Sequence, residues 1–324
     1  LRDRHVPVPQ PVVLGHEGAG VIDAVGPGVT HLAVGDKVVL SFDSCGRCPS
    51  CDDRDPAYCH SWFPLNFGGG RLDGSTALAD EAGNPVHSHI FGQSSFASHA
   101  MAHTRNVVKV DADIPLKILG PLGCGIQTGA GTVLNVLKPR QGSSIAVIGT
   151  GAVGLSAIMA AAIAGAKTVV AIDLLSERVE LAQQLGATHG FKADKGSVSE
   201  FAKAAGCEGG FDYIIDTTGS TAVCNAAVSA LGPRGELALV GAYPPTMKVE
   251  AEASFMMSGG RVVRGVVEGG SDPQNFIPQL IDHYLAGRFP FDRLIEFFAF
   301  EDIAEAIAAG ESGKVIKPVL VFEN

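Results

Sequence analysis

The sequence predicts an α/β protein built from two parts, and three observations lead to this prediction. Residues 1–125 contain short apolar runs, such as 20–22 and 37–40, separated by glycine and proline turns, which is typical of β structure. From about residue 130, strand-like runs alternate with helical periods, which predicts a doubly wound parallel sheet with helices on both faces. After residue 267 the pattern is mixed again.

The individual elements follow from these patterns. In the alternating part, strands are expected at 145–148, 168–172, 213–216, 236–240 and 262–266, with helices at 153–164 and 177–185. Beyond it, a helix is expected near 278–286 and a last strand near 318–322. Residues 142–166 carry no charge and are long enough to cross a membrane, but three glycines divide them into a strand, a turn and a helix. The favoured interpretation is a buried βα unit, and a membrane span is the alternative.

Composition narrows the class of function. The 324 residues include 24 basic and 34 acidic side chains, a net charge of −10, which argues against nucleic acid or an anionic membrane as the main partner. A hydrophobic content of 46% implies a sizeable core. No signal peptide is visible and four of the seven cysteines are clustered, so we expect a reducing, cytoplasmic location.

The clustered cysteines predict a metal site. They follow the spacing C-x2-C-x2-C-x7-C and comprise Cys45, Cys48, Cys51 and Cys59. Four thiolates on one loop can close a tetrahedron around one zinc ion. Two disulfides are the alternative, but nothing in the sequence indicates secretion. A closed four-thiolate site has no open position, so this zinc is expected to stabilise a lobe over about residues 43–60 without taking part in chemistry.

A glycine motif predicts a dinucleotide site. Gly149-Thr-Gly151-Ala152-Val153-Gly154 follows the strand 145–148 and opens a helix, whose amino end can receive a pyrophosphate. Asp173 ends the next strand, where a carboxylate binds the ribose hydroxyls and repels a 2′-phosphate. This favours NAD over NADP, although Arg178 lies nearby and would soften the preference. A glycine-rich turn without a ligand is the alternative.

A second group of metal-binding residues is less complete. His16 and Glu17 lie in one glycine-rich turn, and Cys124 lies in another. An imidazole and a thiolate are two parts of an open zinc site, which needs three protein ligands and leaves a position for water or substrate. Glu17 is expected either to supply an oxygen ligand or to act just outside the ligand shell. Simple packing is the alternative for His16 and Cys124 taken singly.

The order and spacing of these motifs resemble the zinc-dependent medium-chain alcohol dehydrogenases over essentially the whole chain. The stretches 91–96, 121–129 and 264–269 look most like the bacterial aryl-alcohol (benzyl alcohol) dehydrogenases. The resemblance implies a GroES-like catalytic domain split around a Rossmann domain. The expected parts are a catalytic part at 1–127, an NAD-binding part at 128–266, and a return to the catalytic domain at 267–324.

The resemblance also assigns roles to single residues. His16 and Cys124 resemble catalytic zinc ligands, and Glu17 resembles the acidic residue beneath that metal. Asp173 and Arg178 match the pair at the adenosine ribose. Thr128, Val240 and Gly241 resemble positions that touch the nicotinamide, and Lys317 stands where a basic residue contacts the pyrophosphate. The expected substrate-pocket residues are Val6, Ser41, Phe42, Phe91, Ala242 and Val267.

The implied activity is the reversible oxidation of primary aryl or allylic alcohols to aldehydes with NAD. Two zinc ions are expected per full-length subunit, one catalytic and one structural, in a homodimer or homotetramer. The family's first catalytic zinc ligand would lie upstream of Leu1, so we expect this chain to be truncated at its amino end. The alternatives are a glutathione-dependent formaldehyde dehydrogenase, another zinc alcohol dehydrogenase, or a catalytically silent NAD-binding module with a structural zinc.

Overall fold

The computed structural model describes residues 8–322, which form two compact units. The first unit contains the chain up to Gly125, Ser271–His283 and the chain from Asp292 onward. The second unit contains Ile126–Gly270 and Tyr284–Phe291. These divisions differ by a few residues from the expected boundaries after residues 127 and 266, and the short segment that returns to the second unit was not expected.

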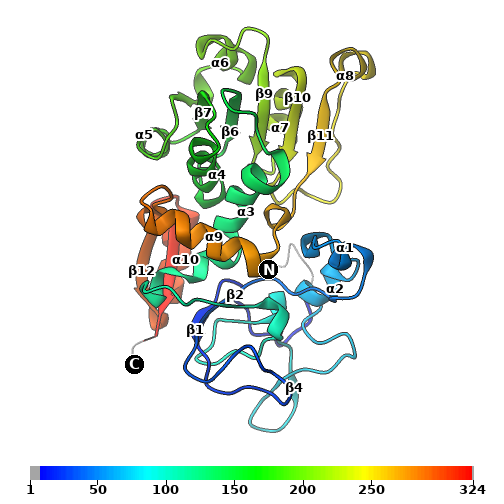
Figure 1. Ribbon diagram of the computed structural model, residues 1–324, viewed down its shortest axis with the longest axis vertical. Helices are drawn as coiled ribbons and strands as arrows, with labels where there is room; N and C mark the ends of the chain where they lie inside the picture. Colours follow the sequence, from blue (N-terminus) through cyan, green and yellow to red (C-terminus); the bar gives the residue numbers. More distant parts are fainter. Residues whose placement is uncertain (1–7, 323–324) are drawn as a thin grey trace. The chain divides into compact units, whose positions relative to one another are not determined.

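A six-stranded parallel sheet forms the centre of the second unit (Figure 1). Its spatial order is β11-β10-β9-β6-β7-β8, so the chain extends the sheet first to one side of β6 and then to the other. The switch point lies between β6 and β9, where open α/β sheets bind ligands beyond the carboxyl ends of the strands. The strands are β6 (Ser144–Ile148), β7 (Thr168–Asp173), β8 (His189–Lys192), β9 (Phe211–Asp216), β10 (Leu231–Leu239) and β11 (Val262–Gly265).

Helices cover both faces of this sheet because neighbouring strand residues point to opposite sides. A side chain at Gly154 of α4 would meet Val147 of β6, whereas Ala146 and Ile148 pack with Phe201 of α6 and with α7. The helices of this unit are α3 (Gly125–Gly131), α4 (Ala152–Ile163), α5 (Ser176–Gln184), α6 (Val198–Ala204), α7 (Thr221–Ser229) and α8 (Ala253–Gly259), and α3 continues into a π-helical segment over Thr132–Leu137.

The uncharged stretch 142–166 is therefore a βα unit, as the sequence predicted. It forms β6 and α4, and both are buried. Among the described residues, no helix combines the length and the apolar character that a membrane crossing needs.

The first unit contains small sheets. β1 (Ala19–Val21), β2 (Lys37–Leu40) and β5 (Val107–Lys109) form an antiparallel sheet, β3 (Leu78–Ala79) pairs with β4 (Pro85–Val86), and β12 (Ile295–Ala299) pairs in parallel with β13 (Lys317–Val321). Its helices are α1 (Pro49–Asp52), α2 (Trp62–Phe67), most of α9 (Pro273–Leu285) and α10 (Ile303–Glu311).

Short 3-10 helices occur in both units, at Pro56–Tyr58, Ile90–Gly92, Thr104–Asn106, Leu116–Ile118, Gly120–Gly123, Ala193–Lys195, Glu268–Gly270, Phe291–Leu294 and Phe300–Asp302.

One helix begins earlier than its sequence suggested. The sequence predicted this helix near residues 278–286. The helix α9 instead begins at Pro273, since proline favours the first turn of a helix, and Pro278 lies inside it.

Candidate functional site

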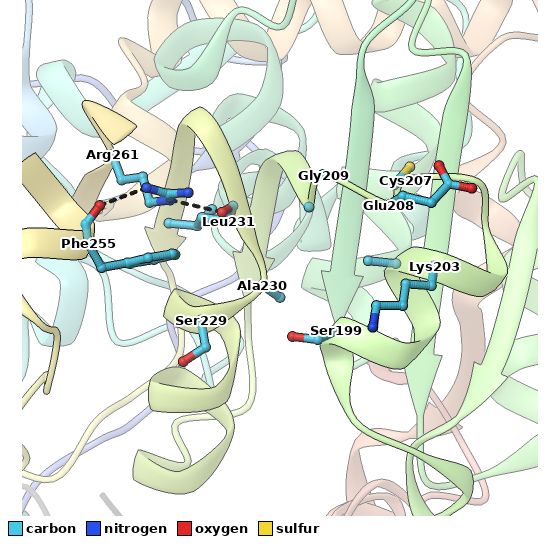
Figure 2. A pocket seen from close by; sticks show the side chains of 12 residues that line it. Ser199, Lys203, Cys207, Glu208, Gly209, Ser229, Ala230, Leu231, Phe255 and Arg261 are labelled. Carbon is cyan, nitrogen blue, oxygen red and sulfur yellow. Dashed lines mark hydrogen bonds between the residues drawn. The ribbon is translucent and has the colours of Figure 1, made fainter. Parts of the chain in front are cut away.

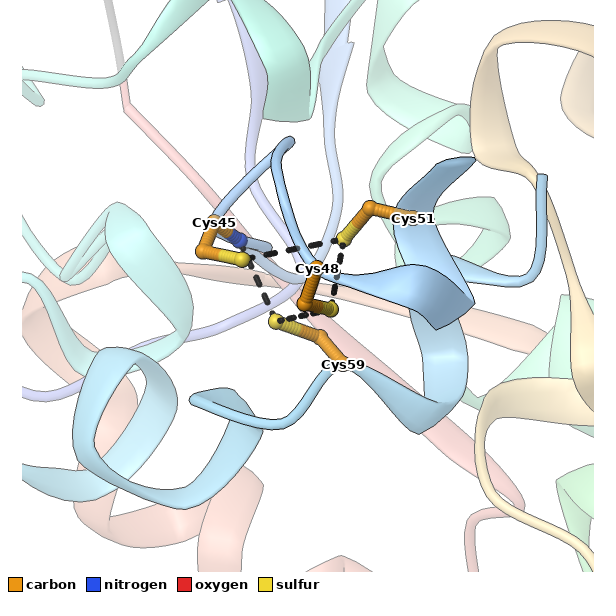
Figure 3. A group of neighbouring side chains, drawn as sticks. All are labelled: Cys45, Cys48, Cys51 and Cys59. Atoms are coloured by element: carbon orange, nitrogen blue, oxygen red, sulfur yellow. Dashed lines mark hydrogen bonds between the residues drawn. The ribbon is translucent and has the colours of Figure 1, made fainter. Parts of the chain in front are cut away.

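The four clustered cysteines converge on one point in the first unit. Their sulfur atoms point toward one another from the loop after β2, from α1 and from the turn that follows Tyr58 (Figure 3). The Sγ–Sγ distances are 3.6 Å for Cys48–Cys51 and 4.0 Å for both Cys45–Cys51 and Cys48–Cys59. A zinc–sulfur bond of about 2.3 Å implies tetrahedral sulfur–sulfur separations of about 3.8 Å, whereas a disulfide needs about 2.05 Å. The thiols therefore fit a zinc ion and are not paired as disulfides.

Backbone N–H groups donate to two sulfur atoms of this quartet. Cys45 N donates to Cys59 Sγ at 3.2 Å, and His60 N donates to Cys48 Sγ at 3.5 Å. These donors favour the charged sulfur. The bond from His60 lowers the pKa of Cys48 to about 6, whereas burial raises the pKa of Cys59 to about 12. The loop is fixed to the rest of the unit by Arg105, whose Nε donates to Ser44 O at 2.8 Å. A zinc here would have four sulfur ligands and no open position.

The second predicted metal group also assembles within the first unit. One ligand atom each from His16, Glu17 and Cys124 lies within 4.8 Å of the others. His16 and Glu17 precede β1, and Cys124 ends a 3-10 turn just before α3. Among residues 8–322, these three make up the whole group. Nitrogen and sulfur donors at this spacing fit a zinc ion, and burial lowers the pKa of His16, which keeps its imidazole in the neutral form that binds metal.

Glu17 makes two strong contacts of its own. Its Oε1 accepts a hydrogen bond from Gly125 N at 2.9 Å, and its Oε2 lies 2.5 Å from Lys317 Nζ. Burial alone would raise the pKa of Glu17, but the Lys317 ammonium holds it below its ordinary value. Through its bond to Gly125 N, Glu17 is suited to hold the Cys124–Gly125 turn in place. Lys317, expected at a pyrophosphate, contacts this carboxylate.

An aromatic cluster borders the second metal group. The Phe91 ring centroid lies 4.8 Å from that of His16 and 5.2 Å from that of Phe67, and Trp62 meets Phe91 edge-on at 5.9 Å. Cys124 packs against the same cluster. Phe91 has a φ of 53°, a left-handed conformation that costs about 1 kcal/mol or more in a bulky residue. Val6, which was also expected in the substrate pocket, lies outside the residues that the structure describes.

The predicted dinucleotide motif forms the turn between β6 and α4 in the second unit. Gly149 has a φ of +86°, and a Cβ there would lie 2.4 Å from Thr217 Oγ1. A Cβ on Gly154 would lie 1.9 Å from Gly149 O, so the close approach of helix and strand requires glycine. Ala152 and Val153 begin α4, which has no side-chain cap on its first N–H groups. That end of the helix suits a phosphate.

The remaining expected cofactor residues lie in the same unit. Asp173 ends β7 and Arg178 is buried in α5. Val240 N and Gly241 N both donate to Asp216 O, at 2.9 and 3.1 Å, which fixes the loop after β10 to the end of β9. Thr128 is buried in α3.

Two polar residues on this edge of the sheet were missed by the sequence analysis. Thr150 donates to Asp173, and Tyr243 Oη donates to the fully buried Asp216 carboxylate at 2.9 Å. Thr150 stands at a variable position of the glycine motif, and Tyr243 follows the last strand-like residue by three positions. Neither has a local pattern that would have indicated its partner.

A cavity of about 200 Å³ lies elsewhere in the second unit (Figure 2). Its lining includes Gly210 and Ala230, which immediately precede β9 and β10, so it opens at the amino ends of the strands. The glycine motif follows the carboxyl end of β6, at the opposite edge of the sheet. Burial raises the pKa of Cys207 in this lining and keeps the thiol protonated. The cavity is therefore separate from the predicted cofactor site.

Two family models match the chain. Residues 1–112 match the alcohol dehydrogenase GroES-like domain, and residues 152–285 match the zinc-binding dehydrogenase model. The predicted fold class, a GroES-like domain with a parallel Rossmann-type sheet, is thereby confirmed.

Individual relatives are similar over nearly the whole chain. Geraniol dehydrogenase from Castellaniella defragrans is 48% identical over 319 residues, covering 98% of this chain and 85% of that protein. The crystal structure of an alcohol dehydrogenase zinc-binding domain protein from Burkholderia ambifaria is 51% identical, with a TM-score of 0.97 over 100% of this chain and 87% of that one. Benzyl alcohol dehydrogenase from Acinetobacter calcoaceticus is 44% identical, with a TM-score of 0.95 over 99% and 87% of the two chains.

Proposed function

This chain belongs to the zinc-binding medium-chain alcohol dehydrogenases, and on that premise we propose that it oxidises primary aryl and allylic alcohols reversibly to aldehydes with NAD. Zinc and a nicotinamide dinucleotide are the cofactors of this family. The names of two relatives, a geraniol and a benzyl alcohol dehydrogenase, agree with an allylic or aryl substrate.

The aromatic cluster beside His16 carries the substrate proposal. Phe91 packs on the His16 ring, and Trp62 and Phe67 extend the aromatic surface behind it. A substrate whose hydroxyl carbon adjoins an aryl ring or an alkene can cover such a surface, and offset or edge-on ring contacts add about 1 kcal/mol per pair. A short aliphatic alcohol leaves most of this surface uncovered. The cluster therefore favours benzylic and allylic alcohols.

The chain's own residues divide the chemical work. A bound zinc ion would act as a Lewis acid at the alcohol oxygen, and His16 and Cys124 would be ligands of that zinc. Glu17 holds the turn that carries Cys124. In the second unit, the glycine motif would hold the pyrophosphate and Asp173 would hold the adenosine ribose, which favours NAD over NADP. Thr128, Val240 and Gly241 would hold the nicotinamide, whose chemistry when bound is hydride transfer.

Initial rates with NAD test the substrate proposal. We expect kcat/KM for benzyl alcohol and geraniol to exceed that for ethanol by more than tenfold, and Phe91→Leu to reduce this preference. Phe297→Leu, a matched change at a phenylalanine 40% exposed in the same unit, should leave it unchanged. Higher activity on a polyol or on S-hydroxymethylglutathione would contradict the proposal and favour the glutathione-dependent alternative.

Metal content tests whether the protein is a catalyst at all. An open catalytic zinc needs three protein ligands, and His16, Glu17 and Cys124 each bring one ligand atom within 4.8 Å of the others. We expect two zinc ions per chain by elemental analysis. A single zinc together with retained NAD binding and no turnover would instead identify a silent, zinc-stabilised NAD-binding module.

We also propose a cytoplasmic homodimer formed through the edge strand β11. Among the described strands, β11 stands at the edge of the sheet beside β10, and its Val262 is 41% exposed. The outer edge of a sheet is a template for a strand from a second copy. Light scattering should give a dimer that Val262→Lys weakens, whereas a tetramer in the parent protein would require a further interface. None of the seven cysteines, all of which lie within residues 8–322, forms a disulfide, which agrees with a reducing compartment.

A further inference from the structure

Thr150 contacts the carboxylate that the proposed function assigns to the ribose. It lies between the first two glycines of the motif and is 0% exposed. Its backbone N–H and its hydroxyl both donate to Asp173 Oδ2, at 2.6 and 2.8 Å. Leu175 N donates to the other oxygen, Oδ1, at 3.0 Å. Asp173 is thus held by the turn after β6 as well as by its own loop.

These contacts decide which oxygen remains available. A carboxylate offers about four lone-pair positions, two on each oxygen, and the two Thr150 donors fill both positions of Oδ2. Within residues 8–322, Oδ1 accepts one such bond, from Leu175 N, so it is the oxygen that can be presented to an incoming ligand. A ribose with free hydroxyls can donate to it, whereas a 2′-phosphate brings negative charge to the same place.

We propose that Thr150 is a specificity-determining positioning residue, whose hydroxyl fixes the Asp173 carboxylate so that the site accepts NAD and rejects NADP. The inference rests on the proposed use of a nicotinamide dinucleotide. It adds a second residue to the discrimination, one that acts through Asp173 and not through the ligand.

Arg178 explains why losing the hydroxyl should change specificity as well as affinity. Arg178 is buried in α5, and the Asp173 charge opposes the lowering of the pKa of Arg178 by burial, so the two groups interact. Without the Thr150 hydroxyl, Asp173 is freer to turn toward Arg178. Its charge would then be offset, and the repulsion of a 2′-phosphate would weaken.

Calorimetric titration of the purified protein with NAD and with NADP tests this inference. In Thr150→Val, which keeps the shape and removes the donor, we expect the Kd for NAD to rise about tenfold and the Kd for NADP to stay the same or fall, so that the NAD:NADP preference drops at least fivefold. Thr150→Ser keeps a hydroxyl and should restore the preference. Thr150→Ala serves if the valine variant does not fold, as judged by its thermal melt.

A double-mutant cycle separates positioning from general packing. In an Asp173→Ala background, Thr150→Val should change the Kd for NAD less than twofold, because the hydroxyl no longer has a carboxylate to hold. An unchanged NAD:NADP preference in folded Thr150→Val and Thr150→Ala, or an equal loss in both backgrounds, would overturn the inference. Failure of the parent protein to bind either dinucleotide would instead overturn the proposed cofactor.

Discussion

Two glycines of the dinucleotide motif should respond to the same substitution in opposite ways. Gly154 packs against the strand turn, whereas Gly151 has no atom within 4 Å of the place where a Cβ would stand. Gly154→Ala should therefore damage the fold of the second unit. Gly151→Ala should leave the fold intact and weaken only the binding of the dinucleotide, because the backbone at this position must approach the pyrophosphate.

The magnitudes follow from the distances. A Cβ on Gly154 would lie 1.9 Å from Gly149 O, so α4 would have to move by more than 1 Å, at a cost of about 3 kcal/mol. Gly151 has a φ of −73°, which alanine adopts without strain. Alanine is a poorer N-cap than glycine, but it also restricts the unfolded chain, and these effects of about 1 kcal/mol each oppose one another. A methyl group that displaces the pyrophosphate should raise the Kd for NAD about tenfold, or 1.4 kcal/mol.

Urea denaturation followed by circular dichroism measures the first effect, and calorimetric titration with NAD measures the second. The expected pattern is an unfolding midpoint that falls clearly for Gly154→Ala and barely moves for Gly151→Ala, with weaker NAD binding in Gly151→Ala. Equal destabilisation by both substitutions, or unchanged NAD affinity in Gly151→Ala, would refute the assignment of these two roles.

Three further predictions follow from other sites. Cys48→Ser should cause the loss of one zinc ion per chain and lower the melting temperature, since the quartet loses one of its four ligands. Elemental analysis measures the zinc, and an unchanged zinc content would argue against the site. Tyr243→Phe should lower the free energy of unfolding by about 1.5 kcal/mol, because the buried Asp216 carboxylate loses a donor at 2.9 Å. Chemical denaturation measures this free energy, and an unchanged value would mean that another donor replaces the hydroxyl. Burial lowers the pKa of His89, so the contribution of His89 to stability is fully present above the ordinary histidine pKa and is lost as the pH falls from there through the folded pKa. His89→Asn, in which asparagine tolerates the left-handed φ of 65°, should flatten the decline in stability between about pH 7 and 5. An unaltered pH profile would exclude His89 as the source of this decline.

The central strands could be predicted from the sequence because buried strands consist mainly of apolar residues. β6 is buried at all five positions, and its apolar run ends at a glycine turn that opens a helix. β8 was missed because it contains His189, Gly190 and Lys192 and lies at the edge of the sheet, paired only with β7. Its strand conformation results from that pairing and not from local preference. β12 was missed for a similar reason, since its partner β13 lies later in the chain.

Whether a candidate site could be predicted from the sequence also depended on how far apart its residues lie in the chain. The cysteine quartet comes from one loop, so spacing alone predicted it, and the sulfur distances agree with a zinc ion. The role of Glu17 was left open between metal ligand and support, because its partners lie in two distant segments, at Gly125 and Lys317.

Glu17 joins the turn that carries His16, the turn that carries Cys124 and the last strand of the described chain. A site whose donors come from separate segments needs such a connection, and Glu17 provides it through Gly125 and Lys317. The same reasoning applies in the second unit, where Thr150 engages Asp173 across two strands. In both sites, a residue that contacts the expected ligand-binding group determines the orientation of that group. A sequence motif does not show this contact, because the two residues lie apart in the chain.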